Sequence, residues 1–388
     1  MSPIAALSLP DPDPNAAAQS RRLCARIADE IHLAGGWIPF ARYMELALYA
    51  PSLGYYSGGT EKFGGAGDFV TAPELSPLFA DTLAAQVTQI MARSAGQIIE
   101  AGPGTGALAA EMLLELERRG ALPEHYMLLE LSAELRARQR ATIEQRAPKL
   151  AACVSWLERL PQHFSGTVIA NEVLDAMPTH LVAWREDGIF ERGLAAQGEY
   201  GFRWQERPAT GALLEAAGTI PVTPPYLSEI GLAARAWVGS WGEILQQGAL
   251  LLVDYGFPVR ELYHPQRSRG TLMCHYRHHA HDDPLYLPGL NDITAHVDFT
   301  AMAETGVDRG LSLYGYTSQA QFLFNCGITE VLARIAPEDM TNYPRQASAA
   351  HKLLSPSEMG ELFKVMALGK GIETPLIGFG RGERSHRL

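Results

Sequence analysis

The residues of this chain best suited to chemistry stand around a glycine-rich stretch at residues 97–108. An apolar run there ends in Glu100, and three glycines follow at alternate positions, Gly102, Gly104 and Gly106. Glycines permit a sharp turn and let a ligand lie against backbone that carries no Cβ atom. The apolar residues after the last glycine predict a helix whose first unpaired N–H groups point to the same place. This arrangement is typical of a site for a cofactor that contains a nucleoside.

The glycine spacing leaves three interpretations open. Gly102, Gly104 and Ala107 fit the loose dinucleotide fingerprint of NAD and FAD enzymes, in which alanine replaces the third glycine. Glu100 and the additional Gly106 favour S-adenosylmethionine (SAM), because SAM enzymes commonly have an acid here that faces the methionine amine. The third interpretation is a turn with a purely structural role. Of the three, the pattern favours SAM.

Glu130 and Trp156 fall where the nucleoside of such a cofactor would lie. Glu130 ends the apolar run 126–130, and an acid at the end of the second strand accepts hydrogen bonds from ribose hydroxyls. A solvated carboxylate at the end of a strand is the alternative. Trp156 follows the next apolar run, and its ring either covers an adenine or packs in the core.

The stretch 171–178 holds the candidate residues for the reaction itself, Asn171, Glu172 and Asp175. Methyl transfer from a sulfonium to nitrogen requires the nitrogen to lie in line with the S–CH₃ bond, and such positioning contributes about 7–11 kcal/mol. A guanidinium is planar and cationic, so a carboxylate pair such as Glu172 and Asp175 would hold its fork of donors. The alternative is a helix N-terminus at which acids stabilise the helix dipole.

Two later stretches offer additional polar side chains. Four histidines gather between His275 and His281, but neither paired cysteines nor an HExxH pattern accompanies them. We interpret this cluster as a polar flap or surface loop and expect no metal site. The stretch 292–299 mixes acids with His296, and it either lines the acceptor pocket or forms a plain turn and strand.

A parallel sheet is needed to bring these residues together, because ligands bind beyond the carboxyl ends of its strands. Alternating strand and helix patterns predict such a sheet. The predicted strands are 98–101, 126–130, 152–155, 166–170, 249–254 and 374–380. The predicted helices include 77–91, 109–119, 133–146, 237–245 and 355–368. Short antiparallel strands are expected within 181–206.

The predicted domain organisation has three parts. Residues 1–20, rich in proline, alanine and aspartate, are expected to be a disordered tail. Residues 21–92 are expected to form an N-terminal helical cap. Residues 93–388 are expected to form the core, with insertions at about 181–246 and 258–330.

Composition excludes several classes of function. The chain has 388 residues, 47% of them hydrophobic, and a net charge of −11, which argues against a general nucleic-acid or membrane-surface binder. The four cysteines are scattered, which fits a reducing compartment. No apolar run is long enough for a membrane span. The N-terminus has neither the pattern of a secretory signal nor that of a transit peptide, so we expect a cytoplasmic protein.

Five motifs in a fixed order closely resemble the MidA family of class I SAM-dependent methyltransferases. They are Gly67–Ser76, Glu100–Gly106, Asn171–Pro178, Asp254–Gly256 and Asp292–Phe299. The resemblance covers roughly residues 20–380. Mitochondrial members of this family assist the assembly of respiratory complex I by methylating an arginine of one subunit.

The resemblance implies an α/β fold with a Rossmann-like, seven-stranded methyltransferase sheet and a loop at 64–76 that closes over the methionine end of SAM. The predicted cofactor site therefore comprises Asp68, Thr71, Pro73, Glu74, Glu100, Gly102, Gly104, Gly106, Glu130 and Trp156. Relatives usually carry serine where this chain has Ala72, and the mitochondrial ones carry histidine where it has Asn171. Because position 171 lies beside the proposed acceptor site, the mitochondrial substrate does not carry over.

The leading hypothesis is a SAM-dependent methyltransferase that acts on a protein arginine, with Glu172, Asp175 and Asn171 as catalytic residues and without a metal. A subunit of respiratory complex I (NADH dehydrogenase) is a candidate protein substrate, and a homodimer is left open. One alternative is an assembly chaperone that keeps the SAM pocket for stability. Another is a Rossmann NAD-dependent oxidoreductase, for which we identify no acid or base facing a nicotinamide.

Overall fold

The computed structural model describes residues 9–58, 71–198 and 200–388. The chain divides into two compact units built from alternating segments. The first unit comprises Met1–Val70, Pro178–Ile230 and Pro265–Ala295. The second comprises Thr71–Met177, Gly231–His264 and His296–Leu388.

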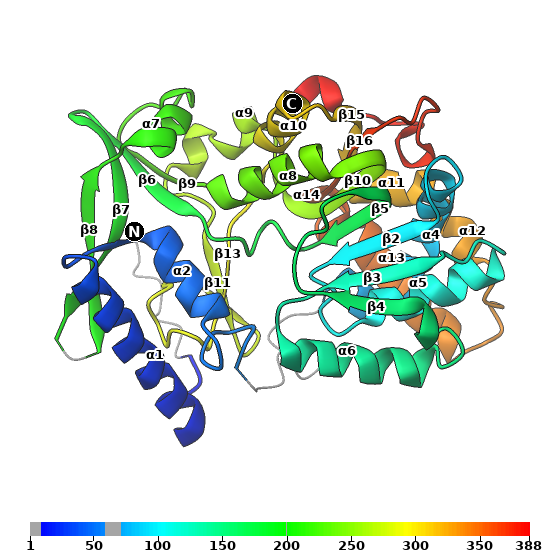
Figure 1. Cartoon of the computed structure of the whole chain (residues 1–388), viewed down its shortest axis with the longest axis horizontal. Helices are drawn as coiled ribbons and strands as arrows, with labels where there is room; N and C mark the ends of the chain where they lie inside the picture. The colour runs from blue at the N-terminus through cyan, green and yellow to red at the C-terminus, as the bar shows by residue number, and fades with distance from the viewer. Residues whose placement is uncertain (1–8, 59–70, 199) are drawn as a thin grey trace. The chain divides into compact units, whose positions relative to one another are not determined.

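The second unit is organised around one eight-stranded sheet (Figure 1). Seven strands follow the order β15-β16-β10-β5-β2-β3-β4, and β14 pairs with the end of β10. The neighbours from β4 to β10 are parallel, whereas β16 runs antiparallel to both β10 and β15. The strands are β2 (Gln97–Ala101), β3 (His125–Leu129), β4 (Val154–Leu157), β5 (Phe164–Asn171), β10 (Leu245–Phe257), β14 (Val297–Asp298), β15 (Ser312–Ser318) and β16 (Phe363–Lys370).

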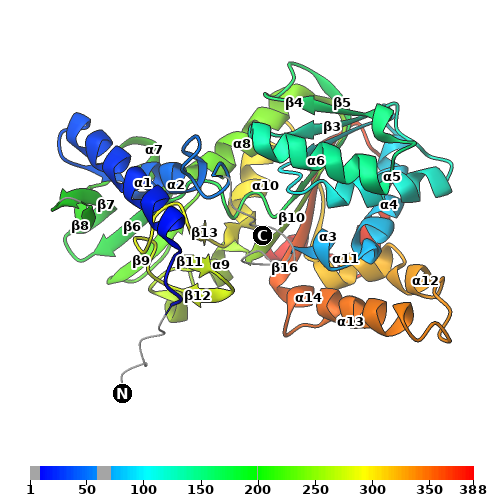
Figure 2. The same ribbon diagram turned by 90° about the horizontal axis from the view of Figure 1, so that it is seen from below.

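Helices bury both faces of this sheet. On β10, Leu250 and Leu252 belong to one hydrophobic core, and Leu251 and Val253 belong to the other, as the alternation of side chains along a strand requires. The first core includes α8 and α10, and the second includes α4, which contacts α11, α12 and α13 (Figure 2). The helices are α3 (Ala72–Leu75), α4 (Pro77–Met91), α5 (Ala107–Arg118), α6 (Ala133–Arg146), α8 (Leu232–Ile244), α9 (Val259–Leu262), α10 (Phe299–Asp308), α11 (Gln319–Asn325), α12 (Ile328–Leu332), α13 (Asn342–Leu354) and α14 (Met359–Leu362).

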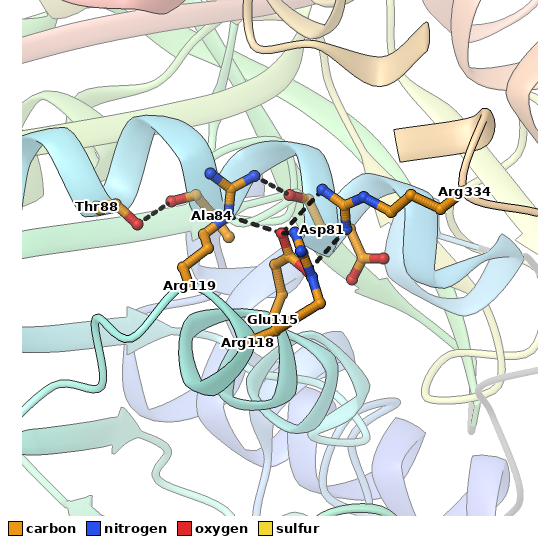
Figure 3. A network of polar contacts seen from close by, with 7 residues as sticks. All are labelled: Asp81, Ala84, Thr88, Glu115, Arg118, Arg119 and Arg334. Carbon is orange, nitrogen blue, oxygen red and sulfur yellow. Dashed lines mark hydrogen bonds and ion pairs between the residues drawn. The ribbon is translucent and has the colours of Figure 1, made fainter. Parts of the chain in front are cut away.

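Glu115 of α5 joins three parts of this unit through its carboxylate (Figure 3). The side chain is 2% exposed and accepts hydrogen bonds from Arg118, Arg119 and Arg334, the last at 2.9 Å. Burial by itself would raise the pKa of Glu115, but the three guanidinium groups outweigh burial and hold the pKa at about 2. Burial and the charge of Glu115 raise the pKa of Asp81 on α4 to about 6. The network therefore links α4, α5 and the segment after α12 electrostatically.

The first unit contains two smaller sheets. Four strands follow the order β1-β7-β6-β9, with β8 paired to β7, and the other sheet has the order β12-β11-β13. The strands are β1 (Ile38–Pro39), β6 (His180–Arg185), β7 (Gly188–Gln197), β8 (Gly201–Pro208), β9 (Tyr226–Ile230), β11 (Met273–Tyr276), β12 (His279–His281) and β13 (Asp292–Thr294). The helices are α1 (Pro14–Leu33), α2 (Phe40–Tyr49) and α7 (Gly211–Gly218). The buried carboxylate of Glu229 accepts N–H bonds from Thr271 and Leu272 at 3.0 Å and so anchors the loop before β11 to β9.

The predicted strands at 98–101, 126–130, 166–170 and 249–254 are confirmed, and the third strand begins at Val154. The predicted helix at 355–368 and the predicted strand at 374–380 are wrong. Phe363–Lys370 forms β16 inside the sheet, and Ile377–Phe379 forms a short 3-10 helix. A strand that is buried on both faces reads as a continuous apolar run, so the sequence carried no alternation to identify it.

The boundaries of the tail, cap and insertions also differ from the prediction. Helix α1 begins at Pro14, where the Asp13 side chain caps it, so residues 14–20 belong to a helix and not to a tail. Helix α4 belongs to the second unit and not to the predicted cap. Helices α8 and α10, predicted within the two insertions, belong to the second unit as well. The inserted segments are therefore shorter than predicted, because these amphipathic helices pack on the large sheet. No helix in the described ranges combines the length and apolar composition needed to cross a bilayer.

Candidate active site

The glycine turn after β2 exposes bare backbone. Gly102, Gly104 and Gly106 have φ angles of 59°, 51° and 83°, in the left-handed region that favours glycine. A Cβ atom built on Gly104 would meet no described protein atom within 4 Å. At Gly106 a Cβ atom would lie 3.1 Å from the Cα atom of Gln139 on α6. The turn thus leaves open space at its centre and is closely packed at its end.

Glu100, at the end of β2, is a buried acid. Its residue is 3% exposed, and its carboxylate accepts a hydrogen bond from the hydroxyl of Tyr126 at 2.6 Å. Burial raises the pKa of Glu100 to about 8, against the effect of this hydrogen bond. A cationic amine beside the carboxylate would favour its ionised form. The position therefore fits the predicted role of facing the methionine amine of SAM.

Glu130 lies just beyond β3, and its two carboxylate oxygens have separate partners. Oε1 accepts the N–H of Ser132 at 2.8 Å, and Oε2 accepts the side-chain amide of Gln139 at 3.1 Å. The same amide nitrogen donates to the carbonyl of Gly104 at 3.0 Å. Burial raises the pKa of Glu130. Gln139 therefore connects the predicted ribose carboxylate with the glycine turn.

Trp156 stands on β4 beside this pair. Its indole N–H donates to Oε1 of Gln139 at 2.9 Å, and the guanidinium of Arg140 lies over its ring, 4.6 Å from the centroid. These polar contacts of Trp156 are with α6, and its predicted role as a cover for adenine stays a prediction.

Gln139 was not identified from the sequence, although one signal was present. Gln139 and Ile143 are the buried residues of α6, at helical spacing i and i+4.

Residues 71–75 connect the glycine turn with the loop after β5. Thr71 precedes α3, which contains Pro73 and Glu74. The hydroxyl of Thr105 in the glycine turn donates to the carboxylate of Glu74, and the N–H of Ala72 donates to Glu172 at 3.3 Å. Of the predicted cofactor residues, Glu74 thus contacts the glycine turn, and Thr71 and Pro73 lie in the same short segment. Asp68, predicted for the same site, lies outside the described residues.

Asn171 ends β5, and Glu172 and Asp175 lie in the loop that follows. The side-chain amide of Asn171 donates to Glu172 at 3.1 Å. Asp175 is 6% exposed, and its Oδ2 accepts the hydroxyl of Tyr255 at 2.6 Å. In the described part of the chain, the buried Oδ1 atoms of Asn171 and Asp175 have no hydrogen-bond partner. Buried acceptors usually have a donor, and a ligand with N–H groups would supply donors to these two.

The histidine cluster and this loop belong to different compact units. His275 lies on β11 and His281 on β12, in the first unit, whereas Asp175 lies in the second. Within the described ranges, no group of three or more metal-ligating side chains is close enough to hold an ion. The stretch 292–299 is divided as well. Asp292 belongs to the first unit, and His296, which contacts the ring of Tyr255, belongs to the second.

The residues at the end of the large sheet fit SAM on their own geometry. The glycine turn leaves open space where a Cβ atom would project, a buried acid stands before it, and a second acid ends the next strand. Glu100 would hold the amine and Glu130 the ribose. Together with a parallel sheet that carries an antiparallel strand beside β10, these features define a class I SAM-dependent methyltransferase.

Comparisons with known proteins agree with this assignment. A family model for S-adenosyl-L-methionine-dependent methyltransferases matches residues 78–317. A crystal structure of a COG1565 superfamily member from Burkholderia thailandensis, bound to S-adenosyl-homocysteine, is 52% identical with a TM-score of 0.95 and covers 98% of this chain and 100% of that chain. A second crystal structure of a COG1565 superfamily protein from that organism is 51% identical with a TM-score of 0.92, at 98% and 100% coverage.

Curated relatives extend the comparison. The mitochondrial protein arginine methyltransferase NDUFAF7 of Bos taurus is 30% identical over 86% of this chain and 80% of its own length. The Drosophila melanogaster homolog is 28% identical over 89% of this chain and 86% of its own length. The chain belongs to the MidA family of SAM-dependent methyltransferases. A related structure that holds S-adenosyl-homocysteine decides the cofactor in favour of SAM over NAD or FAD.

Proposed function

We propose that this methyltransferase transfers the methyl group of SAM to a guanidinium nitrogen of an arginine in a protein. The observation that carries the proposal is that this loop holds two buried oxygens without partners in the described chain, Oδ1 of Asn171 and Oδ1 of Asp175. The side chain of Asn171 also contacts the carboxylate of Glu172. A guanidinium has five N–H donors and no acceptor, so it complements a site made of acceptors. The names of the curated relatives, which are protein arginine methyltransferases, give independent support.

The charges of the loop suit this acceptor. SAM supplies an electrophilic methyl group when it is bound. The attacked nitrogen forms a bond to the methyl carbon while the S–CH₃ bond breaks, which leaves S-adenosyl-homocysteine. The nitrogen also gives up one proton, which a nearby carboxylate can accept. Burial raises the pKa of Asp175 to about 6, although the hydrogen bond from Tyr255 opposes this increase. With this pKa, Asp175 is mostly ionised at pH 7. The pKa is also close enough to 7 for the carboxylate to take up the proton.

Transfer of a labelled methyl group tests the proposal. Trideuteromethyl-SAM and the purified chain are added to a lysate from cells that lack the gene, and labelled methylarginine is quantified after acid hydrolysis. We expect label on arginine with the native chain and at least a tenfold loss with Glu172→Gln, which keeps an acceptor for the N–H of Ala72 but loses the charge. Glu373→Gln, an exposed position away from the loop, is the control. Label on another residue type would overturn the proposal.

The finer expectations rest on the family resemblance. A subunit of respiratory complex I remains a candidate acceptor, and Asn171, which stands where mitochondrial relatives carry histidine, favours a different one. The chaperone role is distinguished by Glu172→Gln, because a chaperone would keep its effect on a partner after methylation is lost. The cytoplasmic location and the homodimer stay predictions. Identifying the labelled protein by mass spectrometry would name the acceptor.

A further inference from the structure

The loop that carries the candidate catalytic residues has a backbone conformation that needs outside support. Glu172 has a φ angle of 54°, which non-glycine residues rarely adopt. Its N–H donates to the carbonyl of Val253 on β10 at 2.8 Å. The chain therefore turns sharply at Glu172, directly after β5, and the end of the neighbouring strand β10 lies beside the turn.

Asp254 on β10 supplies a second and stronger hold on this turn. The residue is 1% exposed, and its Oδ2 accepts the N–H groups of Val173, Leu174 and Asp175 at 3.2, 2.9 and 3.3 Å. Its Oδ1 accepts the N–H of Tyr255 at 2.9 Å. Successive N–H groups that converge on one acceptor form a nest, and here the acceptor is an oxygen of a protein side chain. Burial and the charges of Asp175 and Glu172 raise the pKa of Asp254. The carboxylate of Asp254 thus fixes the path of the loop.

Tyr255, the next residue along β10, binds the side chain of Asp175 through a hydrogen bond. Its hydroxyl donates to Oδ2, and the other oxygen, Oδ1, is the buried acceptor without a partner in the described chain. The phenol ring packs edge-on against His296 and Phe363, each at a centroid distance of 5.3 Å. These two contacts fix the ring, so the hydroxyl has a defined position. One oxygen of Asp175 is therefore occupied, and the other keeps its capacity to accept a hydrogen bond.

We propose that Asp254 and Tyr255 are positioning residues for methyl transfer: Asp254 shapes the loop, and Tyr255 orients Asp175 so that Oδ1 receives an N–H group of the acceptor. This inference rests on the proposed function for the identity of the acceptor. It goes beyond that function because it assigns roles to two residues whose contacts are with Asp175 and its loop. Both act through the loop, and together they explain why two adjacent side chains at the end of β10 are aimed at the end of β5.

If Tyr255 orients Asp175, its removal should change the pKa of Asp175 and with it the pH dependence of the reaction. Removal of a residue with only a structural role would not. Asp175 contacts the hydroxyl of Tyr255, whose ring packs edge-on against His296, and its charge and that of Glu172 act on Asp254. The hydrogen bond from Tyr255 lowers the pKa of Asp175, and burial raises it. Loss of the hydroxyl therefore raises the pKa of Asp175, so the carboxylate forms only at higher pH.

The test compares Tyr255→Phe with the native chain in the labelled methyl-transfer assay between pH 5.5 and 9. We expect the rate at pH 7 to fall about tenfold and the acidic limb of the pH profile to move about one pH unit higher. The dissociation constant of S-adenosyl-homocysteine should change less than twofold, because the cofactor residues are untouched. Tyr314→Phe, which removes one hydrogen bond from Ile372 elsewhere in the unit, should keep the native profile. An unshifted Tyr255→Phe profile overturns the inference.

Asp254→Asn tests the other half of the proposal. The amide oxygen can still accept three N–H groups, but the amide nitrogen then faces the N–H of Tyr255. We expect a loss of kcat of tenfold or more with an unchanged affinity for S-adenosyl-homocysteine. A variant with native kcat, or one in which affinity falls as much as kcat, overturns the positioning role of Asp254.

Failure of the proposed function would look different. If the native chain labels no arginine, the arginine proposal fails, and the positioning of Asp175 is then read from unfolding in urea. The stability deficit of Tyr255→Phe should grow as the pH rises through 6, since the variant binds its proton more tightly in the folded state. A deficit that does not change with pH overturns the inference.

Discussion

The indole nitrogen of Trp156 lies 2.9 Å from Oε1 of Gln139, and this hydrogen bond determines which end of the Gln139 amide faces the cofactor site. With Oε1 engaged, Nε2 donates to the carbonyl of Gly104 and to Oε2 of Glu130 at 3.0 and 3.1 Å. One buried side chain thus fixes both the glycine turn and the predicted ribose carboxylate. The amide has no freedom to rotate without losing all three bonds.

Gln139→Leu should weaken cofactor binding. Leucine fills nearly the same volume but removes the hydrogen bonds to Gly104 and Glu130. Hydrogen bonds to charged groups contribute about 1.5–3 kcal/mol, so we expect the dissociation constant of S-adenosyl-homocysteine to rise about tenfold or more, as measured by titration calorimetry. The control is Gln86→Leu, a buried glutamine of α4 whose partners Gln89 and Gly378 lie elsewhere. Native affinity in Gln139→Leu would contradict this role.

Gly104→Ala should block the cofactor with little effect on the protein. A Cβ atom at this position meets no described atom within 4 Å, so the folded chain bears only the cost of a left-handed alanine, about 1–2 kcal/mol. The same Cβ atom would project into the space that SAM needs. Gly120→Ala carries the same backbone strain, with a φ angle of 65° and equally open surroundings, but lies away from the site. Only Gly104→Ala should lose binding of S-adenosyl-homocysteine, and equal binding in both variants would refute the placement.

Binding of S-adenosyl-homocysteine at pH 7 should release a proton from Glu100. Burial raises the pKa of this carboxyl to about 8, so it is mostly protonated in the cofactor-free chain, whereas an amine beside it requires the ionised form. Affinity should therefore rise from pH 6 to pH 8. Calorimetry in two buffers with different ionisation enthalpies counts the proton. Glu100→Gln should release none, and an unchanged proton count in that variant would assign the proton to another group.

The raised pKa of Glu100 also makes the stability of the protein depend on pH. The folded pKa of Glu100 lies above its ordinary value of 4.5, so its contribution to stability is fully present below about pH 4.5 and declines as the pH rises to about 8. The difference in unfolding free energy between native chain and Glu100→Gln should follow this course. Urea denaturation at several pH values measures the difference.

Glu115→Gln should destabilise the second unit without affecting the cofactor. The variant leaves the guanidinium groups of Arg118, Arg119 and Arg334 without their common countercharge. Because these arginines are partly exposed, we expect a loss of about 2 kcal/mol, between the values for surface and buried pairs. The low folded pKa means that this contribution is present above about pH 4.5 and is lost as the pH falls towards 2. Glu111→Gln, which breaks one exposed pair with Arg146 at 3.3 Å, should cost less than about 0.5 kcal/mol.

The parts of the site that could be predicted from sequence are those made by neighbours along the chain. The glycine turn, the acid before it and the acid after β3 are local patterns, because a strand, a turn and a helix N-terminus follow one another directly. The loop at Asn171–Asp175 was found for the same reason. Its contact with Asp254 joins residues about 80 positions apart, and no spacing rule reaches that far. Gln139 was not predicted as a site residue, because a polar residue among arginines is expected to face solvent until the packing of α6 is known.

In the fold, too, local patterns could be predicted and long-range packing could not. Strands followed by amphipathic helices were predicted, whereas Phe363–Lys370 was mistaken for part of a helix because both of its faces are apolar and buried. The predicted insertions were too long, because the sequence of a helix such as α8 does not indicate which sheet the helix will pack against. Tertiary packing decides these cases.

The position of β16 has a consequence for synthesis of the chain on the ribosome. β10 carries Asp254 and Tyr255, and β16, its partner along Gly248–Tyr255 on one side, comes more than a hundred residues later. Until residue 370 has left the exit tunnel, β10 presents an unpaired apolar edge, the kind of surface that recruits chaperones or other nascent chains. The methyltransferase sheet can therefore close only after nearly all of this sequence has been translated.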